Sequence, residues 1–112
     1  MEREFIIMPE FDRQWAKLGL KDDDLSRLQE AIRKDPKLGS VITGTGGLRK
    51  MRFAFEGRGK SGSSRVLYVD IVIAETTFLI GVYAKNEKEN LTAEETHHLK
   101  VLVETLKSQY EI

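Results

Sequence analysis

Basic side chains are concentrated in one stretch of this chain, between Arg49 and Arg65. Six cations and a single acid, Glu56, give that stretch a charge of +5, although the whole chain has 18 basic and 18 acidic residues and is neutral. A cationic segment in a neutral protein is typical of a surface that binds a polyanion such as a nucleic acid. The six cations are Arg49, Lys50, Arg52, Arg58, Lys60 and Arg65.

The residues that most hydrolases use are absent or badly spaced. The sequence has no cysteine, and its two histidines, His97 and His98, are adjacent and far in sequence from the serines of the basic stretch. Neighbouring residues do not share one helix face, so we expect surface histidines rather than a zinc pair or a nucleophilic triad. We expect no metal and no cofactor. The serines in question are Ser61, Ser63 and Ser64.

A strand and a loop are predicted to carry the basic stretch. From Leu48 to Phe55 the sequence alternates with period two, which places Lys50 and Arg52 side by side on one face. The glycines and serines that follow predict a loop holding Arg58 and Lys60. Such a loop is either a solvated hairpin connection or a segment whose backbone N–H groups approach phosphates.

Two β-branched runs, 66–73 and 77–84, predict a second hairpin. If Phe78, Ile80 and Val82 face the helices, Tyr83 and Lys85 lie on the open face with Lys50 and Arg52; a single bulge would change this parity. A cationic face with a tyrosine permits cleavage of RNA by its own 2′-hydroxyl. That reaction needs a proton acceptor, a proton donor and positive charge around the phosphorane, and no metal.

The remaining elements predict the fold class. A short apolar run ends at Pro9, which begins a helix with Phe11, Trp15 and Leu18 on one stripe. The acids 22–24 begin a second helix as caps rather than as metal ligands, and Thr92 with Glu95 forms a capping box that begins the last one. We expect one α+β domain over residues 1–112, an antiparallel sheet with an N-terminal helical hairpin and a C-terminal helix, all packed on one face.

Length and hydropathy indicate a single-domain protein without a membrane segment. A chain of 112 residues suits a single hydrophobic core. No apolar run approaches the ~18 residues that a membrane span needs, and the N-terminal residues lack the pattern of a signal peptide. We therefore expect a cytoplasmic protein with no membrane partner.

Two runs of this sequence resemble a known family. GTGGLRKMRFAFEGRGKSGSSRVLY, from Gly44 to Tyr68, and FLIGVYAKNEKENLTAEE, from Phe78 to Glu95, are similar to the RelE/HigB toxins of bacterial type II toxin-antitoxin modules, in particular the HigB-like branch. The resemblance implies a RelE-like single domain that cuts messenger RNA on the ribosome and inhibits translation. It also implies a cognate antitoxin as partner, in a hetero-oligomer that binds operator DNA through the antitoxin.

The resemblance implies a role for individual residues. Arg65 matches the phosphate-contacting arginine of the family and would stabilise the transition-state charge. Lys85 matches a basic catalytic residue and would act as the acid, with Tyr83 or Lys50 assisting. Tyr110 follows a long helix, unlike the catalytic tail tyrosine of some relatives. The residues expected to bind RNA are Arg49, Lys50, Arg52, Arg58 and Lys60.

Two other functions stay open from the sequence. A ParE-like toxin that inhibits gyrase would share the fold without a nuclease site, and a non-catalytic RNA-binding domain would use the basic face only to hold phosphates. The set of Lys50, Arg52, Arg65 and Lys85 favours a nuclease over a gyrase inhibitor. Cleavage and simple binding use the same residue types, so the sequence does not separate them.

Overall fold

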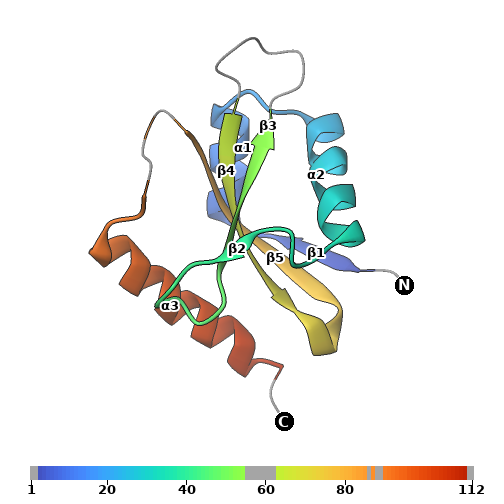
Figure 1. Cartoon of the computed structure of the whole chain (residues 1–112). Coiled ribbons are helices and arrows are strands. Elements are labelled where there is room, and N and C mark those ends of the chain that lie inside the picture. Colours follow the sequence, from blue (N-terminus) through green and yellow to red (C-terminus); the bar gives the residue numbers. More distant parts are fainter. Residues whose placement is uncertain (1–2, 55–62, 86, 88–89, 111–112) are drawn as a thin grey trace.

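The structure is a computed structural model that describes residues 3–54, 63–85, 87 and 90–110. Its centre is a five-stranded sheet with the strand order β1-β5-β4-β3-β2 (Figure 1). A short 3-10 helix, η1 (Val72–Ala74), connects β4 to β5. The strands are β1 (Glu4–Ile7), β2 (Ser40–Val41), β3 (Arg49–Ala54), β4 (Ser63–Ile71) and β5 (Thr76–Ala84), and the helices are α1 (Pro9–Lys17), α2 (Asp22–Lys34) and α3 (Ala93–Ser108).

The α+β class is confirmed, and one strand pairing departs from the expected pattern. Strands β2 to β5 form antiparallel pairs, whereas β1 is parallel to β5, with Glu4 opposite Thr76 and Ile7 opposite Leu79. A parallel pair needs a long crossover connection. The chain between β1 and β5 supplies one, because it contains two helices and three strands.

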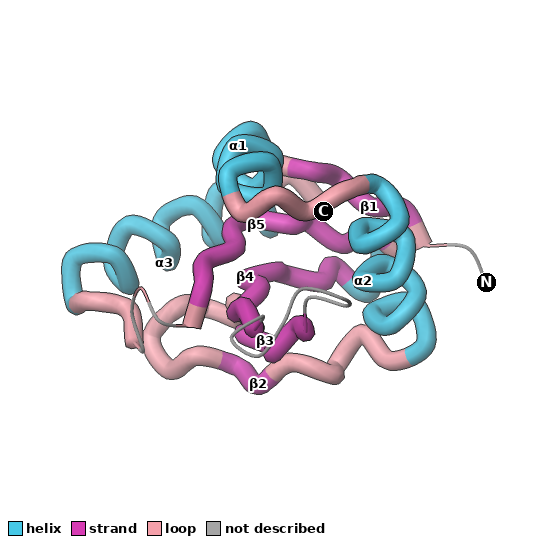
Figure 2. Tube along the Cα trace, turned by 90° about the horizontal axis from the view of Figure 1, so that it is seen from above, coloured by secondary structure: helices cyan, strands magenta, loops and turns pink. Residues whose placement is uncertain are grey.

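The helices cover both faces of the sheet, and the expectation that all three pack on one face is wrong. In Figure 2 the strands are stacked between α2 and α3, which lie on opposite sides. Phe11, Trp15, Leu28 and Ile32 from α1 and α2 form one core cluster, and Val103 and Leu106 from α3 belong to another. Strands β4 and β5 are buried on both faces, as their almost continuous apolar sequences require, so each face needs a cover.

A β-bulge in β5 decides which side chains face which helix. Leu67 is opposite Gly81 and Tyr68 is opposite Leu79, so Ile80 is one extra residue in β5. Simple alternation predicts Phe78, Ile80 and Val82 on one face; Phe78 and Ile80 belong to the α3 cluster, whereas Val82 belongs to the α1 and α2 cluster. Tyr83 follows Ile80 onto the α3 side.

The predicted helix starts are confirmed. The Thr92 hydroxyl accepts from the Glu95 N–H at 3.1 Å, and the Glu95 carboxylate accepts from the Thr92 N–H at 2.9 Å. Asp24 accepts from the Lys21 N–H at 2.9 Å, which is the capping role expected of the acidic triplet. Trp15 is buried in the core, as its apolar helix stripe predicts.

None of the helices that the structure describes is long and apolar enough to cross a membrane.

Candidate nucleic-acid interface

Three side chains, one each from β3, β4 and β5, form a row across the sheet. Arg52 of β3 is directly opposite Arg65 of β4, and Arg65 is directly opposite Tyr83 of β5. Directly opposite residues project from the same face. Because Tyr83 belongs to the α3 cluster, the row lies on the α3 side of the sheet, and Lys50 shares that face because it is two residues before Arg52.

Lys85 extends this arrangement beyond the end of β5. Its N–H donates to the Ser63 carbonyl at 3.1 Å, so the backbone pairing with β4 continues for one more residue. Pleat parity then places Lys85 on the same face as Tyr83. These residues share one side of the sheet as the sequence predicts, but the expectation that this side is open is wrong, because α3 packs on it and Tyr83 is buried. We call Lys50, Arg52, Arg65, Tyr83 and Lys85 the cationic face.

The members of the cationic face differ in exposure. Arg52 and Lys85 are exposed, whereas Lys50 and Arg65 are half-buried. Tyr83 is only 7% exposed and its hydroxyl oxygen is buried, although the residue is among those that line a groove of about 460 Å³ between α1, β5 and the N-terminal part of α3. A ligand in the groove therefore lies beside Tyr83 without reaching its hydroxyl in this conformation.

The Arg65 guanidinium is held weakly and locally. One of its nitrogens donates to the Ser64 carbonyl at 3.3 Å and to the Ser63 hydroxyl at 3.5 Å, both long for hydrogen bonds. A guanidinium has five N–H donors in a planar fork that matches two oxygens of a phosphate. These contacts leave Arg65 able to turn toward a phosphate on the cationic face.

Arg49 lies apart from the other basic residues. It is opposite Tyr68 and therefore faces α2, while Lys50 and Arg52 face α3. Its guanidinium donates to the Gly39 carbonyl at 2.6 Å and more weakly to the Lys37 carbonyl at 3.5 Å. Arg49 therefore ties the connection between α2 and β2 to β3. Arg58 and Lys60, the other two expected contacts of the loop, lie outside the described residues.

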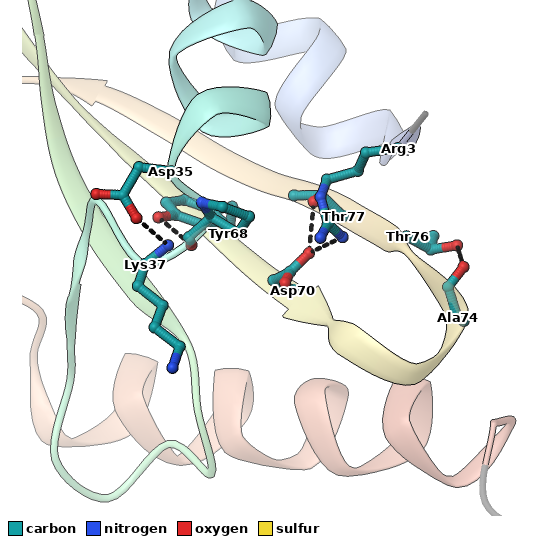
Figure 3. Close-up of polar contacts among 9 residues, drawn as sticks. Arg3, Asp35, Lys37, Tyr68, Asp70, Ala74, Thr76 and Thr77 are labelled. Atoms are coloured by element: carbon teal, nitrogen blue, oxygen red, sulfur yellow. Dashed lines mark hydrogen bonds and ion pairs between the residues drawn. The ribbon is translucent and has the colours of Figure 1, made fainter. Parts of the chain in front are cut away.

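Tyr68 also holds the connection between α2 and β2, and no local sequence pattern predicts this role. Its buried hydroxyl donates to the Pro36 carbonyl at 2.9 Å and accepts from the Gly39 N–H at 2.8 Å. Figure 3 shows Tyr68 beside Asp35 and Lys37 of this connection. Burial raises the pKa of Tyr68 above its ordinary value of 10.0, although the Gly39 hydrogen bond and the nearby Arg49 charge oppose the shift. A Cβ on Gly39 would lie 3.0 Å from the Tyr68 ring, so only glycine fits there without displacement.

A second polar cluster joins three strands on the α1 and α2 side. Asp70 of β4 accepts from the Arg3 guanidinium at 2.6 Å and from the Thr77 hydroxyl of β5 at 2.8 Å (Figure 3). The side chains of Arg3 and Asp70 are 13% and 6% exposed, so this ion pair is largely shielded from water. Nothing in the local sequence around Arg3 distinguishes it from a surface cation.

The histidines and acids do not form a second site within the described part of the chain. His97 and His98 are exposed on α3, as expected. Among residues 3–54, 63–85, 87 and 90–110, no three histidine, aspartate or glutamate side chains are placed together as a metal site would require.

Comparison with known proteins identifies one family. The family model described as the RelE toxin of the RelE/RelB toxin-antitoxin system matches residues 7–111. Among solved structures, the fold is similar to a double mutant of the E. coli toxin RelE in the free state, with 15% identity and a TM-score of 0.57 over 92% of this chain and 98% of that one.

A second solved structure has the same fold. It is the intact E. coli RelBE toxin-antitoxin complex, with 16% identity and a TM-score of 0.52 over 72% of this chain and 94% of that one. The family model describes RelE toxins in general, so assignment to the HigB-like branch stays a prediction.

Proposed function

The chain belongs to the RelE toxin family of RelE/RelB toxin-antitoxin systems, and we propose that it is a ribosome-dependent messenger RNA endonuclease that inhibits translation. The observation that carries the proposal is the alignment of Arg52, Arg65 and Tyr83 on three neighbouring strands. This alignment offers two guanidinium groups to one phosphate region, next to the buried Tyr83 phenol. Lys85 follows on the same face.

The proposed reaction uses the RNA as its own nucleophile. The 2′-hydroxyl gives up its proton to a general base and attacks the adjacent phosphorus, so that a bond from phosphorus to the 2′-oxygen forms as the bond to the 5′-oxygen breaks. The products are a 2′,3′-cyclic phosphate and a 5′-hydroxyl. Arg65 stabilises the negative charge on the phosphorane, and Lys85 gives a proton to the leaving 5′-oxygen. Tyr83 or Lys50 assists Lys85.

Binding of the messenger is assigned to the two cations of β3. Lys50 and Arg52 hold phosphates on either side of the scissile bond, since both share the face of Arg65. Arg58 and Lys60 stay predicted RNA contacts. Arg49 faces α2 and already donates to two backbone carbonyls, so we infer that its contribution to RNA binding is smaller than that of Lys50.

The ribosome is proposed to supply the geometry that the cationic face lacks. Cleavage requires the 2′-hydroxyl, the phosphorus and the leaving oxygen to be in line, and free single-stranded RNA seldom adopts that conformation. The two histidines, which are common acids and bases near neutral pH, lie on α3 outside the five residues of the cationic face, although His98 lines the same groove as Tyr83. A site built from arginine, lysine and tyrosine therefore depends on a substrate that is already held in line.

A protein antitoxin is the proposed partner. The matched E. coli RelBE structure is a toxin-antitoxin complex. We infer that a cognate antitoxin with an acidic or amphipathic segment binds this chain and blocks or distorts the cationic face. The hetero-oligomer would bind operator DNA through the antitoxin, and the free toxin would act in the cytoplasm.

The experiment compares ribosome-bound messenger with the same messenger free in solution, with 5′ ends mapped after addition of the purified chain. The proposal expects cuts only in the ribosome-bound messenger, with 5′-hydroxyl ends. Equal cutting of both substrates would contradict the dependence on the ribosome. Growth arrest with intact messenger and supercoiling defects would instead indicate a ParE-like gyrase inhibitor, and binding without cleavage would indicate a simple RNA-binding domain.

A further inference from the structure

Electrostatic repulsion acts on the end of β3 that carries Arg52. Two positive side chains directly opposite each other on neighbouring strands repel, and this repulsion acts to separate β3 from β4 at Arg52 and Arg65. Strand β2 pairs with β3 only at Arg49 and Lys50. Within the described residues, no strand therefore flanks the outer edge of β3 beyond Lys50, and the end of β3 needs another support.

Arg27 of α2 reaches this strand end from the opposite face. Its guanidinium donates to the Ala54 carbonyl, at the last residue of β3, at 3.2 Å. The same guanidinium lies over the Phe53 ring, with its central carbon 4.5 Å from the ring centroid. Arg27 therefore contacts both residues that follow Arg52.

A residue of the same helix holds the Arg27 guanidinium in place. Asp24, one turn earlier in α2, accepts from the guanidinium at 3.2 Å. Asp24 is 6% exposed, and its other oxygen accepts from the Lys21 N–H at 2.9 Å. The carboxylate that orients Arg27 is thus itself fixed in the first turn of α2, and a charge-assisted bond to such a group is stronger than a bond between neutral groups.

Phe53 connects the Arg27 contact to α1 and to β4. Its ring is 5.7 Å from the Trp15 ring, and its carbonyl accepts from the buried Ser64 hydroxyl at 3.0 Å. Ser64 immediately precedes Arg65. The residues next to both arginines of the row are therefore held on the side of the sheet that the substrate does not touch.

We propose that Arg27 is a positioning residue for the cationic face, holding Phe53 and Ala54 so that Arg52 stays opposite Arg65. The catalytic consequence rests on the proposed function, whereas the structural consequence does not. Arg27 is on the α2 side and has no direct access to a phosphate bound on the α3 side. Its effect on cleavage passes through the placement of Arg52 and Arg65, and small displacements of catalytic groups reduce rates strongly.

Arg33 of the same helix offers a matched control. Its guanidinium lies 5.4 Å from the Phe5 ring of β1 and pairs with Glu30 at 2.6 Å. Arg33 thus makes the same two kinds of contact as Arg27, a carboxylate one turn away and an aromatic ring, but at β1, which is separated from β3 by two strands.

The experiment compares Arg27→Met and Arg33→Met in three measurements: thermal unfolding, kcat and KM on ribosome-bound messenger, and exchange of the Phe53 and Ser64 amide hydrogens, which lie between β3 and β4. We expect Arg27→Met to lower Tm more than Arg33→Met, because the Asp24 side chain is 8% exposed and the Glu30 side chain is 52% exposed. Only Arg27→Met should lower kcat, by about tenfold with KM changed less than about twofold, and only it should speed exchange of the two amides. Should Arg27→Met fail to fold, Arg27→Lys keeps a cation beside Asp24 and is tested in the same way.

The two readouts separate this inference from the proposed function. A wild-type chain that cuts no messenger contradicts the nuclease proposal, and amide exchange still decides the role of Arg27. Unchanged exchange at Phe53 and Ser64 in Arg27→Met overturns the inference. It is also overturned if Arg27→Met and Arg33→Met lower kcat equally, because the loss would then follow general destabilisation.

Discussion

Arg52 of β3 and Arg65 of β4 project directly opposite each other from the α3 side of the sheet. Like charges in this relation destabilise a sheet, so the pair is a cost that the folded chain carries in the absence of a polyanion. A phosphate between the two guanidinium groups would relieve the repulsion. The pair therefore links the stability of the free chain to its proposed ligand, and it leads to the first prediction.

Replacing Arg52 with alanine should stabilise the free chain and weaken RNA binding. Loss of the repulsion with Arg65 is expected to raise the free energy of unfolding by about 0.5 kcal/mol. RNA affinity should fall, and its dependence on salt concentration should become shallower by about one unit in the log-log slope. Denaturant unfolding and RNA titrations at several salt concentrations measure both effects. Lys50→Ala should show the binding effect, and a loss of stability in Arg52→Ala would argue against repulsion.

Replacing Arg65 or Lys85 with alanine should abolish growth arrest and messenger cleavage while the fold is kept. Removal of a group that acts mainly on the transition state costs about 3 kcal/mol, or about a hundredfold in rate. Among the described residues Arg65 makes long contacts to Ser63 and Ser64, and Lys85 is exposed, so neither supports the core. Lys34→Ala, at an exposed lysine of α2, is the control. Full cleavage by Arg65→Ala would refute the site.

Replacing Asp70 with alanine should destabilise the chain without touching the cationic face. The Arg3 guanidinium would lose its partner in a largely shielded position, at a cost of about 3 kcal/mol. The Thr77 hydroxyl would lose its acceptor as well. Asp35→Ala is the control, because Asp35 is exposed and accepts from the nearby Lys37 N–H at 3.1 Å. Thermal and urea unfolding measure the difference, and equal losses in the two variants would contradict a buried ion pair.

Stability should fall at alkaline pH because of Tyr68. Its pKa is raised in the folded state, mainly by burial, so the neutral phenol is favoured there relative to the unfolded chain. The contribution is fully present below the unfolded value of 10.0 and is lost as pH rises through the higher folded pKa. Urea unfolding between about pH 8 and pH 11 measures this loss. Tyr68→Phe should be less stable at neutral pH, because it loses the bond to Pro36, but should show a weaker alkaline decline.

Local sequence patterns determined several features of this protein correctly. The alternation around Met51 places Lys50 and Arg52 on one face, because the pleat of a strand depends only on neighbouring residues. The capping box of Thr92 and Glu95 lies within four residues and depends on helix geometry alone. The burial of Trp15 follows from the apolar stripe of its helix.

Contacts between distant segments decided the rest. The bulge at Ile80 exists only in the pairing of β5 with β4, and it alone places Val82 and Tyr83 on their respective faces. The position of α3 on the opposite face from α2 depends on how two apolar faces of one sheet are covered, which no single segment encodes. Arg27 and Arg33 are both α2 arginines stacked on a ring and paired with an acid one turn away, yet only Arg27 meets the end of β3, because the path of the whole chain brings Ala54 to it.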